Sequence, residues 1–472
     1  MDYGYLTLVA PILTLAVAIV TRKVPLAMLV GIFTGQLIIC GWNPFTAINE
    51  SVNGILSVCA DTGNLKTFLF TALMGAFVIL VRISGGVKGF VNYLTEQSKR
   101  VKSPRMAMLI AYVIGIIIFI DGLLSIMFTG VVTRPLIDKF KVSREKLAYI
   151  CDATSAPVNA IIPLNSWGAM LMGLISAEIA SGYIQGEPMN LLIRSLPFQF
   201  YSILSLLFVL FYIVTGKDWG PMKKAELRVR NTGKLYDDGV TPLLNDNDGF
   251  EELVEEGSEN KWNMMFPLIT LIGGAFIGLL VTGGGNLAAG DGTTAILYSV
   301  VITLLIMCVM YTKQGIMTAK EFGDSVMKGV SSMMGLVILL VLSFSIGGVI
   351  KGMGTGQFLA SLLGDSIDGA FCPAIIFLMG ALMAFCTGTS WGTFSIMMPM
   401  AVAMNGNILL TIGAVVSGGI FGDHCSPLSD TTILSSMSVG TDLYSHVKTQ
   451  LPYALVTAAC AAALYIAFGL IL

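Results

Sequence analysis

Charge is scarce in this sequence. Only 12% of the 472 residues are Asp, Glu, Lys or Arg, and the chain holds two histidines. Hydrophobic residues make up 55% of the chain, and the mean hydropathy is +0.81. A soluble protein of this length could not bury so much apolar surface, so the composition indicates an all-α polytopic membrane protein. We expect the lipid bilayer as a partner, and no nucleic acid.

Catalytic and cofactor motifs are absent as well. The sequence contains no P-loop, no GxSxG and no HExxH, and the glycine-rich stretch 282–292 lacks the Lys-Ser/Thr pair of a nucleotide site. The eight cysteines are scattered without CxxC spacing, which favours packing roles. We therefore expect no enzyme and no cofactor. Without an ATP motor, any transport must be secondary, which means that ion gradients drive it.

The few basic residues gather in six loops. All but three of the 27 Lys and Arg lie around 22–23, 82–105, 134–146, 217–261, 313–328 and 448. The positive-inside rule places these loops in the cytoplasm. Apolar windows then predict ten crossings with both termini outside, the first of which, MDYGYLTLVAPILTLAVAIVTRK, lacks the basic start of a signal peptide. The crossings lie near 6–22, 24–41, 66–84, 147–180, 191–214, 263–282, 293–311, 327–349, 408–437 and 450–472.

Two further apolar segments are too long for one helix, and each is interrupted. Segment 106–137 has basic loops on both sides, so it must enter and leave the membrane on the same face. It is predicted to be a re-entrant hairpin with its tip at FIDGLLS. Segment 370–404 is predicted to be a hairpin from the outside, with its tip at CTGTSWGT. Non-helical backbone at membrane depth survives only where protein or water buries it, so such tips are typical of sites.

The two halves of the chain resemble each other. LMGAFVIL (73–80) matches MMGLVILL 260 residues later, and GLLSIM (122–127) matches GTFSIM 270 residues later. Each half holds five crossings and one hairpin, and because five is odd the halves are predicted to be inverted repeats, as in secondary transporters. We expect the first repeat in 1–214, a cytoplasmic linker in 215–261 and the second repeat in 262–472.

Each half also contains a crossing broken by proline and polar residues. The breaks are CDATSAPVNAIIPLNSWG (151–168) and GDHCSPLSDTTILSS (422–436). Freed carbonyls and side-chain oxygens there can coordinate a cation, and carboxylates at membrane depth are functional candidates by default. The candidate ion- or substrate-binding residues are Asp121, Ser125, Ser155, Asn159, Thr389, Ser390, Asp423, Ser426, Ser429, Asp430 and Thr431. The candidates for a proton-linked role are His424 and Asp152.

Each of these residues has a structural alternative. Asp121, Asp423 and Asp430 could cap broken helices, and the hydroxyls and amides could hydrogen-bond broken backbone. Asp152 could lie near the cytoplasmic surface. Glu178, outside the candidate set, is expected to be solvated at the outer rim.

FGDHCSPLSDTTILSS, followed by GTDLYSHVKTQLPYAL, resembles the signature of the NhaC family of sodium/proton antiporters over about 420–455. The elements PLNSWG and IDGLLSIM extend the resemblance over most of the chain. The resemblance implies Na⁺ and H⁺ as transported ions, an elevator-like motion of a domain with hairpins and broken helices, and a homodimer. The positions that match the signature or its first-half equivalents are Asp121, Asn159, Asp423, Ser426, Ser429 and Asp430.

The leading hypothesis is an inner-membrane Na⁺/H⁺ antiporter. Sodium and a proton would compete for the buried carboxylates of Asp423 and Asp430, and hydroxyls would complete the oxygen ligands of Na⁺. The alternative is an ion-coupled carrier of a small organic solute, an amino acid or a monocarboxylate such as malate or lactate. Families with this signature include such members, and Trp167, Trp391 and nearby glycines could make room for the solute.

Overall fold

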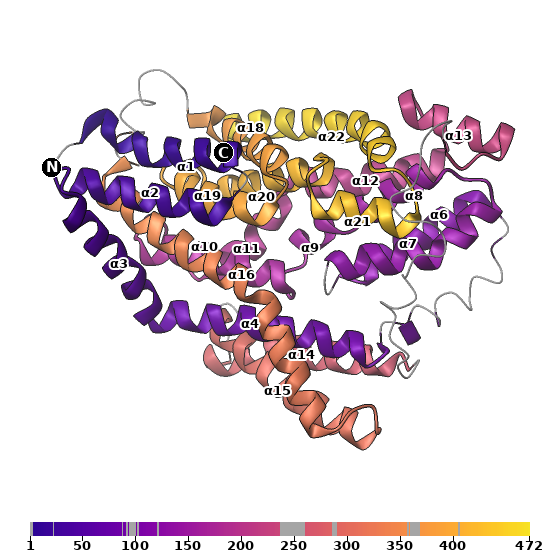
Figure 1. The fold of residues 1–472 in the computed structure, drawn as a ribbon, viewed down its shortest axis with the longest axis horizontal. Coiled ribbons are helices and arrows are strands. Elements are labelled where there is room, and N and C mark those ends of the chain that lie inside the picture. The colour runs from indigo at the N-terminus through magenta and orange to yellow at the C-terminus, as the bar shows by residue number, and fades with distance from the viewer. Residues whose placement is uncertain are drawn as a thin grey trace.

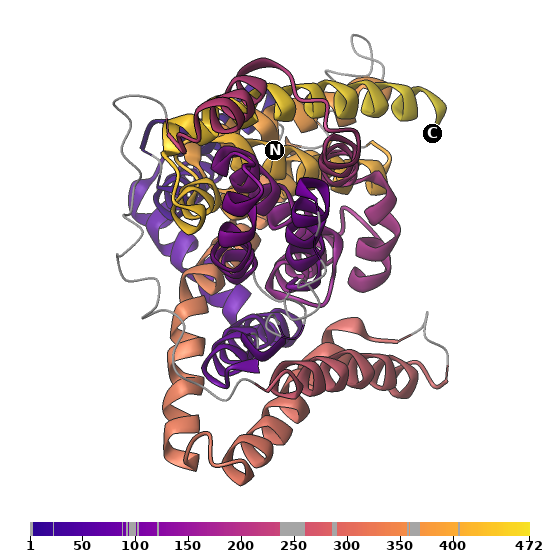
Figure 2. The ribbon, with the colours of Figure 1, turned by 90° about the vertical axis from the view of Figure 1, so that its right-hand side faces the viewer.

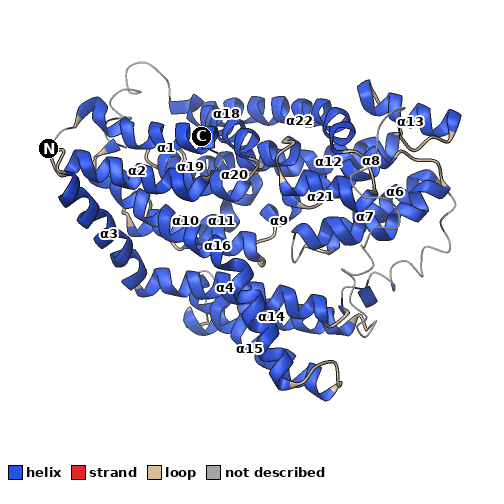
Figure 3. Cartoon of the chain, viewed as in Figure 1, coloured by secondary structure: helices blue, strands red, loops and turns tan. Residues whose placement is uncertain are grey.

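The structure is a computed structural model of the chain. It describes residues 3–21, 23–86, 88–90, 93, 101, 103–119, 122–236, 260–285, 290–355, 358, 369–404 and 406–472. Asp121, one of the predicted site residues, lies outside the described residues. Every regular element in the described part is a helix (Figure 3), which confirms the predicted class.

The helices follow one another through short connections. Those of the first half are α1 (Val9–Thr21), α2 (Val24–Ile39), α3 (Pro44–Ala60), α4 (Thr62–Ile83), α6 (Pro104–Ile117), α7 (Gly122–Lys139), α8 (Arg144–Ala153), α9 (Ala156–Ile161), α10 (Ser166–Ala180), α11 (Pro188–Ser195), α12 (Phe200–Thr215) and α13 (Gly220–Thr232). Those of the second half are α14 (Trp262–Thr282), α15 (Gly292–Lys313), α16 (Ala319–Gly352), α18 (Cys372–Thr387), α19 (Ser390–Val402), α20 (Ile408–Cys425), α21 (Asp430–Val439) and α22 (Leu443–Ile471).

Local sequence explains where many of these helices begin. Ser103 and Ser143 accept hydrogen bonds from backbone N–H groups in the first turns of α6 and α8, and Asp442 does the same for α22. Such caps satisfy donors that have no partner inside the helix. Before α16, Thr318 and Glu321 form a reciprocal capping box.

The described part contains eight helices that are long and apolar enough to cross a membrane, or nine if the pair 144–161 and 166–180, bent by 43°, counts as one span. Ten crossings were predicted, so the two counts differ by one or two. Two of the ten windows lack such a helix, because α1 and α2 have 13 and 16 residues and reach about 20 and 24 Å, short of a hydrocarbon core of about 30 Å. One helix in the count, Gly369–Thr387, belongs to a segment that was predicted to be a hairpin. Lys23 and Pro25 separate them, and the proline starts α2.

The helices form two layers that a long diagonal helix connects. In Figure 1, α18, α20 and α22 lie with α1 and α2 in one layer, while α4, α14 and α15 lie in the other. Helix α16 packs on both α4 and α2 and so joins the layers. Figure 2 shows the same separation from the side. The two broken segments, α8 to α10 and α20 to α21, lie inside the ribbon and not at either end of its long axis.

The linker is more ordered at its start than a flexible tether would be. Helix α13 packs on α8 and α22, and residues 237–259 lie outside the described residues. Lys146 and Asp218 form a buried ion pair, and the partly buried Arg228 pairs with the buried Glu145. In Figure 1 this region lies at one end of the long axis, and both chain ends lie in the opposite half.

Candidate functional site

The second broken helix places a carboxylate inside the protein. Helix α20 ends at Cys425 and α21 begins at Asp430, with Pro427 between them. Asp423 is 2% exposed. Its Oδ2 accepts a hydrogen bond from Ser390 Oγ at 2.7 Å, and its Oδ1 accepts one from Ser429 Oγ at 2.6 Å. Thus α19, α20 and the start of α21 meet at one carboxylate.

Hydroxyl groups continue this cluster. Ser429 Oγ lies 2.9 Å from Thr431 Oγ1, and it also accepts the backbone N–H of Thr431 as the N-cap of α21. We call Asp423, Ser390, Ser429 and Thr431 the carboxylate–hydroxyl cluster. All four side chains are buried. A hydroxyl can donate to a carboxylate or turn a lone pair to a cation, so the cluster can satisfy either partner.

The connection between α18 and α19, the predicted tip of the second hairpin, is packed directly on this break. Gly388 ends α18 with φ +70°, and a Cβ there would lie 2.6 Å from the carbonyl oxygen of Leu428. Ser426 Oγ donates to the carbonyl of Phe385 at 2.7 Å, and Thr389 caps α19 by accepting the N–H of Gly392. Ser426 and Thr389, both predicted ligands, therefore hold the tip in place in this conformation.

Asp430 lies on a different side of the break. Its side chain is exposed, as are Pro427 and Leu428, whereas Asp423 is buried. Asp430 occupies the first turn of α21, where the helix N-terminus favours a negative charge. The two predicted Na⁺ ligands thus differ in exposure. The carboxylate of Asp430 is exposed, and that of Asp423 is buried inside the protein.

The first broken helix carries a neutral network. Ser155 Oγ donates to the carbonyl of Gly122 at 2.7 Å, and Asn159 Nδ2 donates to the carbonyl of Ser155. Asn165 Nδ2 contacts the Phe119 carbonyl and the Asn159 side chain, at 3.2 and 3.1 Å. These bonds join the end of α6 and the start of α7 to α9 and α10. Ser125 donates to the Gly115 carbonyl within the hairpin.

Two aromatic residues connect the halves. The rings of Trp167 on α10 and Trp391 on α19 pack edge to face with centroids 5.6 Å apart, and Phe394 packs on Trp167 at 6.0 Å. Trp167 is 5% exposed. Both tryptophans follow directly on the residues that start α10 and α19, so the two helix starts face each other.

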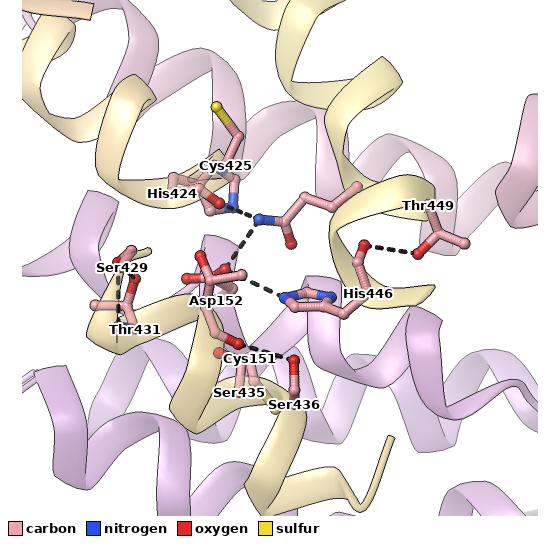
Figure 4. Close-up of polar contacts among 12 residues, drawn as sticks. Cys151, Asp152, His424, Cys425, Ser429, Thr431, Ser435, Ser436, His446 and Thr449 are labelled. Carbon is pink, nitrogen blue, oxygen red and sulfur yellow. Dashed lines mark hydrogen bonds and ion pairs between the residues drawn. The ribbon is translucent and has the colours of Figure 1, made fainter. Parts of the chain in front are cut away.

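A second buried polar network lies among α8, α20 and α22 (Figure 4). Asp152 Oδ2 lies 3.3 Å from His446 Nε2 and accepts a hydrogen bond from Gln450 Nε2 at 2.9 Å. Gln450 Nε2 also contacts the backbone carbonyl of His424, and the His424 ring contacts Tyr201 Oη at 2.8 Å. Asp152 is fully buried among these helices.

Two members of this network, His446 and Gln450, are not among the residues predicted from the sequence. His446 and Gln450 are four residues apart in SHVKTQ, so they lie on one face of a helix. A histidine and a glutamine at this spacing in a mostly apolar helix are the sequence feature from which the two residues could have been predicted. The expectation for Glu178 was also wrong, because its side chain is 1% exposed and lies near Gly347 and Pro399 rather than in solvent.

Among the described residues, no group of three or more His, Cys, Asp or Glu side chains could hold a metal ion. The carboxylate–hydroxyl cluster instead offers carboxylate and hydroxyl oxygens, which are the ligand types of hard cations such as Na⁺.

The model of the Na⁺/H⁺ antiporter family matches residues 165–470. The chain belongs to the Na⁺/H⁺ antiporter family. This match covers α10 to α22 and includes the carboxylate–hydroxyl cluster, and it confirms the resemblance to sodium/proton antiporters. The protein is accordingly a multi-pass membrane protein of a transporter family.

Two relatives and one solved structure extend this assignment. An uncharacterized protein of Haemophilus influenzae is 34% identical over 98% of this chain and 90% of its own length. The malate-2H⁺/Na⁺-lactate antiporter of Bacillus subtilis is 32% identical over 28% of this chain and 29% of its own. The structure of MtrF from Neisseria gonorrhoeae has a TM-score of 0.58 at 13% identity, covering 91% of this chain and 85% of that one. Because the identity is only 13%, the likeness to MtrF concerns the fold alone.

Proposed function

We propose that the protein exchanges Na⁺ for H⁺ at the carboxylate–hydroxyl cluster. One observation carries this proposal: Asp423 is buried at a helix break, and hydroxyls from two other elements contact both of its oxygens. Asp430 on the exposed side of the same break would meet the ion first. Membership of the Na⁺/H⁺ antiporter family supports the choice of ions.

The exchange follows from the cost of burying charge. An unpaired carboxylate is unfavourable in a low-dielectric interior, whereas a proton or a Na⁺ neutralises it. Asp423 is therefore expected to cross the membrane loaded with one ion or the other, and to return loaded with the competitor. With a proton bound, one carboxyl oxygen donates. With Na⁺ bound, Ser390 and Ser429 rotate their lone pairs towards the cation.

The motion that carries the site belongs to this proposal. We propose inverted repeats in 1–214 and 262–472 and an elevator-like movement of the hairpins and broken helices in a homodimer of the inner membrane. The two hairpin tips packed on two broken helices support such a unit. Both chain ends would face outside, because they lie in the half opposite the basic region around α13.

The second candidate function is ion-coupled transport of a small organic solute. The Trp167–Trp391 pair favours it, because two aromatic faces between the helix starts could contact a monocarboxylate or an amino acid. The relative from Bacillus subtilis carries malate and lactate in its name. In this reading Asp423 would hold the coupling ion.

The test uses proteoliposomes that contain a pH-sensitive dye. A sodium gradient should move protons in the wild-type protein, and Asp423→Asn should abolish the movement. Asp291→Asn, which removes the carboxylate that caps α15 and pairs with Lys66 but leaves an oxygen able to cap, is the matched control and should retain it. Absence of any Na⁺-driven proton movement between pH 6 and 9 would refute the proposal. Movement that requires lactate, malate or an amino acid would favour the second function.

A further inference from the structure

We propose that Asp152 and His446 form a proton-binding site that is separate from the carboxylate–hydroxyl cluster and releases its proton when Na⁺ binds there. The inference rests on the proposed Na⁺/H⁺ exchange and adds a second proton carrier to it. Neither residue has a part in the cluster around Asp423. Their location among three helices, α8, α20 and α22, is drawn in Figure 4.

The geometry is that of a pair built to share a proton. His446 Nε2 lies 3.3 Å from Asp152 Oδ2, and both side chains have no exposed surface. A buried carboxylate beside a neutral imidazole carries one net negative charge, which is costly in a low-dielectric interior. One added proton makes the pair neutral, whether it rests on the carboxyl group or on the ring.

The hydrogen bonding of the pair is incomplete. In the described part of the chain, Asp152 Oδ1, His446 Nδ1, Gln450 Oε1 and His424 Nε2 are buried and have no hydrogen-bond partner. These atoms are free to accept or donate a hydrogen bond when a proton is added to the pair. Three of the four atoms belong to titratable groups, and the fourth belongs to the amide that contacts Asp152.

Gln450 links the pair to the cation cluster. Its Nε2 contacts both Asp152 Oδ2 and the carbonyl of His424, the residue that follows Asp423 in α20. A Na⁺ at Asp423 adds a positive charge near the pair and lowers its proton affinity. By linkage, a proton on the pair lowers the affinity for Na⁺ by the same factor. This reciprocal effect is the coupling that an antiporter needs.

Other titratable groups surround the pair. Those on α8, α12, α20 and α22 are Tyr149, Cys151, Tyr201, Asp423, His424, Cys425 and Tyr453. The charged groups on α7, α8 and the α13 region that lie towards the basic end of the molecule form their own ion pairs: Asp138, Arg144, Glu145, Lys146, Asp218 and Arg228. Among these groups, Asp152 and His446 are the carboxylate and the imidazole that contact each other directly.

The experiment measures proton release and Na⁺ binding separately in purified full-length protein. NaCl, or choline chloride as a blank, is added to weakly buffered protein with a pH indicator, and bound ²²Na⁺ is counted in parallel. In Asp152→Asn and His446→Gln, protons released per Na⁺ bound should fall by about one, while Na⁺ binding persists. Both substitutions keep a polar group of similar size. If one of the two variants does not fold, the other still tests the inference.

Thr449→Val is the matched control. Thr449 lies on α22 one turn from His446, is buried, and hydrogen-bonds only to backbone of its own helix. Its proton release should equal that of the wild type. Unchanged proton release in both variants would overturn the inference, and so would loss of Na⁺ binding in both, which would place the pair in the cation site. Failure of the proposed function is distinguishable, because wild-type protein would then release no proton.

Discussion

At the residue scale, Ser429 and Ser426 have different roles: Ser429 contacts the proposed ion-binding carboxylate, and Ser426 contacts only backbone that holds the neighbouring loop. Ser429 donates to Asp423, whereas Ser426 donates to the backbone carbonyl of Phe385. A hydrogen bond to a charged group contributes about 1.5–3 kcal/mol, so Ser429→Ala should raise the Na⁺ concentration for half-maximal exchange roughly tenfold or more. Ser426→Ala should lower thermal stability and leave that concentration within about twofold. The measurement is Na⁺-dependent exchange in proteoliposomes, and a larger shift for Ser426→Ala than for Ser429→Ala would contradict the assignment.

The sequence could identify which residues are candidates but not how they group. Polar side chains inside apolar runs are costly, and for that reason Asp423 and Ser429 could be found without a structure. Which hydroxyl reaches which carboxylate oxygen depends on how α19 is rotated against α20. Ser390 and Asp423, which meet in this way, are 33 residues apart in the sequence. Asp152 and His446 are 294 residues apart, a pairing that no local pattern indicates.

At the element scale, close contact between α18 and α20 fixes the height of Asp423. A Cβ added at Gly422 would lie 2.4 Å from the backbone nitrogen of Phe385, so a side chain there must push the hairpin away. Gly422→Ala should therefore lower the thermal midpoint and reduce Na⁺ affinity together. At Gly380, on the same interface, an added Cβ meets its nearest atom at 3.5 Å, an ordinary contact. Gly380→Ala should leave both unchanged, and equal damage by both variants, measured by scanning fluorimetry and exchange, would refute this account.

Element existence was easier to predict than element length. Prolines and polar runs indicated the breaks at Pro157 and Pro427, and the helices do end near them. The windows 6–22 and 24–41 are apolar enough to span, but the α-helices in them have only 13 and 16 residues, because a 3₁₀ helix (Gly4–Leu8) precedes α1, and α2 ends at Ile39. Hydropathy counts apolar residues without regard to where the chain turns, and this is why it predicted two crossings there.

At the scale of the whole molecule, the linker is anchored to the region that holds the proposed proton site. Ser143, at the start of α8, donates from both N–H and Oγ to Glu226 of α13. Arg144 pairs with Asp138 of α7 and donates to the carbonyl of Gly440 after α21. The charge pattern of 215–261 indicated a polar linker, but not that its first helix packs against α8, because each pairing requires a partner on another helix.

This anchoring makes a prediction about stability. Lys146 Nζ lies 2.7 Å from Asp218 Oδ2, and the two side chains are 4% and 6% exposed. Removing one member of a buried pair leaves an uncompensated charge and costs about 3–5 kcal/mol. Lys146→Ala should therefore lower the thermal midpoint by several degrees. Arg230→Ala is the matched control, because Arg230 pairs with Glu226 at 3.6 Å but is 55% exposed, and its loss should cost less than about 1 kcal/mol.

The double variant Lys146→Ala/Asp218→Asn decides the cause of that loss, because it differs from the single variant only in the charge of Asp218. If the unpaired carboxylate of Asp218 is what destabilises the single variant, removing both charges should recover most of the midpoint, since buried pairs can be replaced by neutral groups at little cost. Scanning fluorimetry in detergent, run at two salt concentrations, provides the measurement. A double variant no more stable than Lys146→Ala would mean that the lysine acts by packing its stem, and that charge pairing is not what holds α8 to the start of the linker.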